Sequence, residues 1–265
     1  MTTKPMTRVL VLHGYAQNNV IFSKRLAALR KEGKDIDFVF VAAPHTLLPE
    51  DMFAPPSSFD AQGDDAAPTA EQIQSSPSTA QRGWWRAKQA EYEGLTDSLI
   101  YLRNIMKETT FDGVLGFSQG AALAALLTSL LERPHLYPPF LIDGKSPHPP
   151  FKFCIAVSGF RMRDSFCDPF FSPPYETPTL HVIGKTDALV SEESSRRLVE
   201  ASKNPRVEEH EGGHFVPSKA PWRKFLANYI RDPAGDVPSP PAAPAEAGSV
   251  TASAEASGAN TPNPA

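Results

Sequence analysis

The sequence has few cysteines and lacks long hydrophobic runs. Its two cysteines, Cys154 and Cys167, are too few for a disulfide framework, so we expect reduced thiols and a cytoplasmic or nuclear location. No apolar run approaches the about 18 residues of a transmembrane helix, which predicts a protein without a membrane span. The short apolar run at 9–12 stops at His13-Gly14 without a small-residue cleavage site. We interpret it as a first strand and not as a signal peptide.

The sequence also lacks an excess of positive charge. It holds 26 Lys and Arg against 30 Asp and Glu, for a net charge of −4, and no basic stripe that could follow phosphates. Nucleic acid is therefore not expected as a partner. The four surplus acidic residues lie in residues 232–265, which contain no Lys or Arg, so residues 1–231 are balanced in charge.

Residues 232–265 differ from the rest of the chain in composition. They contain no aromatic residue, no Leu and no Ile, but seven of the 27 prolines. Such a segment cannot bury enough apolar area to offset the entropy of ordering it, so we expect a disordered tail after a domain of residues 1–231. Within that domain, Pro-rich stretches at 54–83 and 133–150 predict a flap and a long loop.

The remaining sequence alternates between apolar runs and amphipathic stretches. Strands are predicted at 8–14, 36–44, 111–118, 152–158, 178–184 and 206–210, and helices at 18–32, 95–109, 119–132, 191–203 and 218–230. This alternation predicts an α/β fold with a mostly parallel central sheet and helices on both faces. Neither a G-x-G-x-x-G motif after the first strand nor a P-loop is present, so no nucleotide cofactor is expected.

The motif Gly116-Phe117-Ser118-Gln119-Gly120 matches G-x-S-x-G. A predicted strand leads into it and an Ala/Leu-rich helix follows, which is the strand–turn–helix context of a nucleophile elbow in an α/β-hydrolase fold. Glycine at both ends of the motif is needed because side chains there would collide with the neighbouring backbone. Ser118 is therefore the predicted nucleophile.

A serine nucleophile needs a base and an acid, which follow it along the chain in this fold. Asp187 lies just beyond the predicted strand 178–184, where it could orient an imidazole. Asp164 and Asp168, in a Phe/Pro-rich loop before that strand, are weaker rivals. A helix-capping or turn role is the structural alternative for Asp187.

The stretch His210-Glu211-Gly212-Gly213-His214 admits two interpretations. As H-E-x-x-H it matches a zinc-protease motif, which requires both histidines on one helical face. Two adjacent glycines would cost about 1 kcal/mol each inside a helix, and residues 207–210 have the pattern of a strand. We therefore predict His214, on a loop before the last helix, as the general base, His210 as a surface or strand residue, and no metal site.

The oxyanion of an acyl-transfer intermediate needs two backbone donors. The N–H of Gln119, after the nucleophile, is one candidate, and the N–H of Tyr15, after His13-Gly14 at the end of the first strand, is the other. Trp84 and Trp85 are interpreted in two ways: as anchors of the flap on the core, or as an apolar wall for an acyl chain.

These segments together resemble a known family. The stretches "VLHGYAQN", "RGWW", "FDGVLGFSQGAALAALL", "VSGF", "GKTDALV" and "HEGGHFVP" are similar to the fungal-type serine hydrolases of the α/β-hydrolase superfamily, related to esterases of the ovarian-tumour-suppressor-candidate type. The resemblance runs from residue 7 to about 230. It implies a Ser118–Asp187–His214 triad and a carboxylesterase of acyl esters. It also implies, as in some similar fungal proteins, a thioesterase that releases polyketide acyl chains.

We therefore predict a serine hydrolase that cleaves acyl esters or thioesters, including carrier-bound chains, through an acyl-enzyme and without cofactor or metal. The alternative is a non-catalytic α/β-hydrolase-fold protein that binds a ligand or serves as a scaffold. Acyl-chain length and oligomeric state are not predicted by the sequence.

Overall fold

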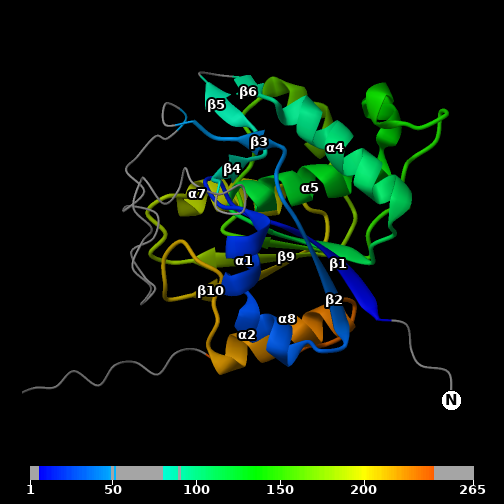
Figure 1. Cartoon of the computed structure of the whole chain (residues 1–265). Coiled ribbons are helices and arrows are strands. Elements are labelled where there is room, and N and C mark those ends of the chain that lie inside the picture. Colours follow the sequence, from blue (N-terminus) through cyan, green and yellow to red (C-terminus); the bar gives the residue numbers. More distant parts are fainter. Residues whose placement is uncertain (1–5, 49–50, 52–79, 89–90, 242–265) are drawn as a thin grey trace, which may run out of the picture.

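A six-stranded sheet forms the centre of the molecule in the computed structural model shown in Figure 1. The structure describes residues 6–48, 51, 80–88 and 91–241. The strand order is β10-β9-β8-β7-β1-β2, and all neighbouring strands run parallel. The strands are β1 (Thr7–Leu12), β2 (Ile36–Val41), β7 (Gly113–Phe117), β8 (Phe153–Val157), β9 (Thr179–Gly184) and β10 (Pro205–His210). The predicted α/β class with a parallel sheet is confirmed.

Helices cover both faces of this sheet, so the strands are buried on two sides. One face carries α4 (Leu95–Glu108), α5 (Gln119–Glu132), α6 (Asp168–Phe171) and α7 (Glu192–Glu200). The other carries α1 (Asn19–Arg25), α2 (Ala27–Glu32) and α8 (Ala220–Arg231). Alternate residues of β1 enter the two cores: Leu10 and Leu12 join the first, and Val9 and Val11 the second. This explains why the strand is a continuous apolar run.

The helix predicted at 18–32 is two helices, which corrects the expectation of one. Leu26 ends α1 and begins α2 with φ −88° and ψ 12°. Phe22, Leu26 and Leu29 are all buried in the same core cluster. The bend at Leu26 lets both short helices bury their apolar side chains against the curved sheet.

Two short antiparallel strand pairs and several 3₁₀ turns were not predicted. β3 (His45–Thr46) pairs antiparallel with β4 (Arg82–Gly83), and β5 (Arg86–Lys88) pairs antiparallel with β6 (Glu91–Glu93). Of the predicted flap at 54–83, residues 54–79 lie outside the described part of the chain. Its last two residues, Arg82 and Gly83, form β4. The predicted loop at 133–150 contains the 3₁₀ helices η3 (Pro134–Leu136) and η4 (Pro138–Phe140), and η5 (Ser165–Cys167) lies before α6.

The beginning of the predicted tail packs on the domain. Val237 is buried in the cluster formed with α8, and the Ser239 hydroxyl donates to Glu208 Oε1 on β10 at 2.7 Å. Val237 and Ser239 therefore contact the domain beyond residue 231, and the boundary after residue 231 stays a prediction. Residues 242–265 lie outside the described part of the chain.

The longest described helices, α4 and α5, have 14 residues each. No helix in the described part of the chain has both the length and the apolar character needed to cross a membrane.

The fold places four loops at one edge of the sheet. The loops after β1, β7, β9 and β10 all follow the carboxyl ends of parallel strands, and these ends meet at a common edge. The predicted site residues from these loops are therefore brought to the same side of the molecule.

Candidate active site

Ser118 occupies a strained turn between β7 and α5. Its φ is 54° and its ψ is −119°, a conformation that non-glycine residues rarely adopt. The turn is tight: a Cβ on Gly116 would lie 2.2 Å from the carbonyl oxygen of Gly120, and a Cβ on Gly120 would lie 2.3 Å from that of Leu12. Glycine is therefore required on both sides of the serine, as the G-x-S-x-G pattern predicted.

The His214 imidazole reaches this serine from the loop between β10 and α8. Its Nε2 lies 2.9 Å from Ser118 Oγ. The ring also packs against Phe117, with the ring centroids 4.9 Å apart. The His214 side chain is 14% exposed, so the imidazole is largely buried but still reached by solvent.

Asp187 completes the arrangement from the turn after β9. Its Oδ2 lies 2.7 Å from His214 Nδ1, and its Oδ1 accepts the backbone N–H groups of Leu189 and Val190 at 2.9 Å each. Burial disfavours the charged carboxylate, but the bonds from His214 and from these N–H groups outweigh it and lower the pKa of Asp187 below its usual value. The ionised Asp187 keeps the proton on His214 Nδ1, which leaves Nε2 free to accept the proton of Ser118.

The two rival aspartates are engaged elsewhere. Asp164 accepts the backbone N–H groups of Tyr92 and Phe166, and Asp168 pairs with Arg161 at 2.9 Å. Of the three candidates, Asp187 is the one that contacts His214.

The H-E-x-x-H stretch has strand and loop geometry. His210 is the last residue of β10, and His214 lies in the loop that follows. Glu211 pairs with Lys185. The two imidazoles therefore do not share a helical face, as a zinc-protease motif requires. In the described residues, no group of three His, Cys, Asp or Glu side chains is arranged to hold a metal ion.

The loop after β1 packs directly against the nucleophile elbow. A Cβ on Gly120 would approach the His13 carbonyl oxygen to 2.5 Å, which shows how closely the loop and α5 are packed. The His13 Nε2 accepts the N–H of Ala43 at 3.0 Å, so its Nδ1 carries the proton and donates to the Gly14 carbonyl at 2.7 Å. Burial lowers the pKa of His13 to about 4, which keeps this tautomer neutral. His13 thus shapes the loop that carries Tyr15.

Gln119 directly follows the serine, and Tyr15 follows Gly14, where a Cβ would lie 3.3 Å from Ser118 Cβ. Gln119 is the first residue of α5, where a backbone N–H has no partner within the helix. Tyr15 lies in the turn after β1, and its hydroxyl donates to the carbonyl of Asp51 at 2.7 Å. Their role as oxyanion donors stays a prediction.

The side chain of Gln119 makes contacts that the sequence did not reveal. Its Oε1 accepts the N–H of Trp84 at 2.8 Å, and its Nε2 donates to the carbonyl of Trp85 at 2.9 Å. Sequence reasoning assigned Gln119 only a backbone role, since no local pattern signals a partner 34 residues away. The bonds tie the tryptophan segment to the start of α5.

Both tryptophans are buried, at 0% and 2% exposure. Trp84 Nε1 donates to the His13 carbonyl at 2.9 Å, and Trp85 stacks on Tyr92 with centroids 5.1 Å apart. This geometry corresponds to the anchoring interpretation. Contact of either indole with an acyl chain would require a rearrangement of this packing, so the substrate-binding role stays a prediction.

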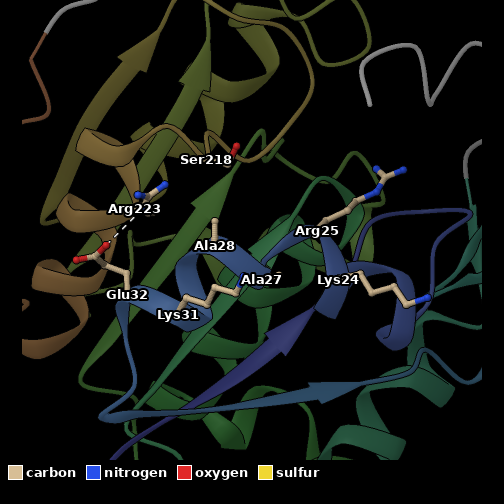
Figure 2. Close-up of a pocket in the computed structure, with 8 residues that line it drawn as sticks. All are labelled: Lys24, Arg25, Ala27, Ala28, Lys31, Glu32, Ser218 and Arg223. Atoms are coloured by element: carbon tan, nitrogen blue, oxygen red, sulfur yellow. Dashed lines mark hydrogen bonds and ion pairs between the residues drawn. The ribbon is translucent and has the colours of Figure 1, made fainter. Parts of the chain in front are cut away.

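A separate groove of about 520 Å³ lies on the face that carries α1, α2 and α8. Figure 2 shows its lining: Lys24, Arg25, Ala27, Ala28, Lys31, Glu32, Ser218 and Arg223. Arg223 pairs with Glu32 at 3.3 Å, and Lys24 and Arg25 extend away from this pair. No member of the Ser118–Asp187–His214 group lines the groove. Its lining holds no serine–histidine pair, so the groove is separate from the Ser118–Asp187–His214 group.

A parallel sheet with helices on both faces and a strained serine between strand and helix define an α/β-hydrolase. Acyl-protein thioesterase 2 of Zea mays has a similar structure, with a TM-score of 0.55 and 16% identity over 86% of this chain and 94% of that chain. At this identity the likeness shows the fold alone.

The chain belongs to the serine hydrolase (FSH1) family, whose sequence model matches residues 1–226. It is 34% identical over 247 residues to esterase OVCA2 of Danio rerio, covering 87% of this chain and 99% of that protein. It is also 34% identical over 235 residues to an uncharacterized hydrolase of Schizosaccharomyces pombe. The match spans about half of that relative, 52% of its length. The predicted family is confirmed, and membership supports a hydrolase of the esterase class.

Proposed function

We propose that the protein cleaves acyl esters or thioesters by nucleophilic catalysis, with Ser118 as nucleophile, His214 as general base and acid, and Asp187 as the residue that orients His214. The observation that carries this proposal is the pair of contacts at His214: 2.9 Å from Nε2 to Ser118 Oγ and 2.7 Å from Nδ1 to Asp187 Oδ2. Both lie within the range for proton transfer between positioned groups.

In the proposed first half-reaction, Ser118 Oγ attacks the carbonyl carbon while its proton passes to His214 Nε2. The N–H groups of Tyr15 and Gln119 hold the resulting oxyanion; one such donor contributes about 3 kcal/mol to transition-state stability. The tetrahedral intermediate expels the alcohol or thiol, which takes the proton from His214, and Ser118 remains acylated.

In the second half-reaction, water attacks the acyl-enzyme and gives a proton to His214. That proton returns to Ser118 Oγ when the carboxylic acid leaves. The ionised Asp187 stabilises the imidazolium in both halves. The alternative of a non-catalytic binding or scaffold protein is disfavoured by the strained conformation of Ser118, since such strain persists where function requires it.

Labelling with a fluorophosphonate probe tests the proposal. We expect the wild-type protein to be labelled and Ser118→Ala to remain unlabelled. A wild-type protein that resists labelling and does not hydrolyse a short p-nitrophenyl ester would contradict the proposal and favour the binding alternative.

Substrate class is tested by matched oxygen and sulfur esters of the same acyl chain. We include carrier-bound acyl or polyketide chains among the substrates of this proposal; the maize structural relative is itself a thioesterase by name. A higher kcat/KM for N-acetylcysteamine thioesters than for the matched oxygen esters is the expected result for carrier release. The opposite ranking would assign the protein to carboxylic esters.

A further inference from the structure

The loop that carries His214 is tied on one side to the turn that carries Asp187. The N–H of Lys185 donates to the His210 carbonyl at 2.9 Å, and the N–H of Thr186 donates to the Gly212 carbonyl at 3.2 Å. These bonds extend the pairing of β9 with β10 beyond the sheet. They hold the two loops together and contact the turn from residue 211 to His214 at the Gly212 carbonyl. The Thr186 hydroxyl also donates to the Glu211 carbonyl at 3.4 Å.

His210 holds that turn from inside the protein. Its side chain is buried, and its ring packs on Phe215 and on the edge of Trp222, with centroid distances of 5.0 and 5.7 Å. Its Nδ1 accepts the backbone N–H of Gly212 at 3.2 Å. Gly212 lies two residues before His214, and Phe215 directly follows it. The ring therefore contacts the loop on both sides of His214.

The chemistry of this contact fixes the protonation state of His210. Because Nδ1 accepts a hydrogen bond, the neutral ring carries its proton on Nε2. That Nε2 is buried and makes no hydrogen bond to the described part of the chain. A phenyl ring would fill the same space without an unpaired N–H, so packing alone does not account for a histidine here. The feature that histidine adds is the acceptor at Nδ1.

We propose that His210 is a positioning residue, whose Nδ1 holds the Gly212 N–H and thereby aims His214 at Ser118. This inference rests on the proposed function, because it assumes that His214 is the base. Misplacement of a catalytic group by about 1 Å can cost 100-fold in rate. We therefore expect loss of the acceptor to act on kcat, with little change in KM.

The charges around His210 are consistent with this role. Burial lowers its pKa, while the facing carboxylates of Asp187 and Glu211 act in the opposite direction, and the net direction is downward. Glu211 is itself paired with Lys185. The ring thus keeps its acceptor at neutral pH; a protonated ring would turn an N–H toward the N–H of Gly212.

Three variants separate positioning from packing. His210→Phe keeps a ring against Phe215 and Trp222 but has no acceptor. His210→Asn places an amide oxygen where Nδ1 lies but has no ring, and His210→Gln, its matched control, carries the amide one methylene further out. We expect kcat on a short p-nitrophenyl ester to fall about 10- to 100-fold in the Phe and Gln variants and to stay within about threefold of wild type in the Asn variant.

Melting temperatures give the second readout and follow the opposite order. His210→Asn, which loses the ring, is expected to melt lowest, and His210→Phe close to wild type. Activity that follows melting temperature across the three variants, or a Phe variant with wild-type kcat, would overturn the positioning role. If Phe does not fold, the comparison of Asn with Gln decides alone.

The proposed function and this inference fail in different ways. Wild type and Ser118→Ala are assayed beside the His210 variants. An inactive wild-type protein contradicts the proposed function. An active wild type, an inactive Ser118→Ala and an unimpaired His210→Phe contradict only the role of His210.

Discussion

Two serine–histidine pairs in this molecule have the same separation and different surroundings. His214 Nε2 lies 2.9 Å from Ser118 Oγ, and His181 Nε2 lies 2.9 Å from Ser202 Oγ. The distance alone therefore does not define a catalytic pair. The two pairs differ in the group that makes the next hydrogen bond, in the exposure of the side chains, and in whether the histidine Nε2 donates or accepts.

The His181 pair is a structural hydrogen-bond chain. Ser202 Oγ donates to the Tyr175 hydroxyl at 2.7 Å, so His181 Nε2 is the donor to Ser202. All three side chains are buried, and burial alone lowers the pKa of His181 to about 3. No carboxylate is among the causes of this shift, so nothing there would stabilise an imidazolium.

The His214 pair has the reverse arrangement. Asp187 accepts from Nδ1, so Nε2 is an acceptor for the serine proton. Ser118 stands at φ 54° in the elbow, whereas Ser202 follows α7 and forms a parallel bridge with Tyr175. A carboxylate, partial exposure and a strained serine are therefore the features that separate the Ser118–His214 pair from the buried His181–Ser202 pair.

Of the two serine hydroxyls, that of Ser118 should affect activity most when it is removed. We expect Ser118→Ala to reduce kcat by about 10⁶-fold, as loss of the nucleophile does in other serine hydrolases. Hydrolysis of a p-nitrophenyl ester by the purified wild-type and variant proteins measures this loss of kcat. A Ser118→Ala protein with activity above one hundredth of wild type would place the nucleophile elsewhere.

The carboxylate is the next largest contrast between the pairs. Asp187→Asn keeps the size of the side chain but favours the wrong tautomer of His214, and we expect kcat to fall by about 10⁴-fold. The pKa of Asp187 is below its usual value, so the wild-type carboxylate is ionised throughout the neutral range. Steady-state kinetics at neutral pH check this, with Asp168→Asn as a matched control that should behave as wild type. An Asp187→Asn protein as active as that control would remove Asp187 from the mechanism.

The sequence predicted the contact between Ser118 and His214 and not the contact between His181 and Ser202, for a physical reason. Ser118 lies in a motif that demands glycine at fixed positions, and Asp187 and His214 each follow a predicted strand. Parallel topology then brings such positions to one edge. Nothing in the sequence near His181 or Ser202 signals their contact, because it depends only on how β9 packs against the end of α7.

The same distinction applies to the rest of the fold. Long elements such as β1 and α5 follow from apolar runs of the right length, which tertiary packing reinforces. The bend at Leu26, the two-residue strands β3 and β4, and the contacts of Gln119 depend on side chains distant in sequence. Periodicity in a short window carries no information on them.

The buried His181 should make the stability of the protein depend on pH, which gives a further test of the difference between the two pairs. The pKa of His181 is lowered to about 3 in the folded protein and is about 6.5 when unfolded, so the unfolded state binds the proton first. The stability due to this group is complete above pH 6.5 and is lost as the pH falls toward 3, by about 1.4 kcal/mol per pH unit.

His181→Gln removes this titration while keeping a polar group near Ser202. We expect its unfolding free energy, measured by urea denaturation, to fall less steeply between pH 6 and about 4 than that of wild type. His13, whose pKa is lowered to about 4, titrates in both proteins and provides a common background. Equal slopes for the two proteins would show that His181 is already protonated or exposed in the native state.

The smallest expected effect comes from Ser202→Ala. This change leaves His181 Nε2 and the Tyr175 hydroxyl without their shared partner, and we expect a loss of about 1–3 kcal/mol in unfolding free energy, since both groups stay buried. The esterase kcat should stay at its wild-type value, because neither group contacts the elbow. Paired urea denaturation and steady-state kinetics test both statements on one preparation. A kcat that falls while stability is unchanged would mean that the two serine–histidine pairs are coupled, and the contrast drawn from their surroundings would not hold.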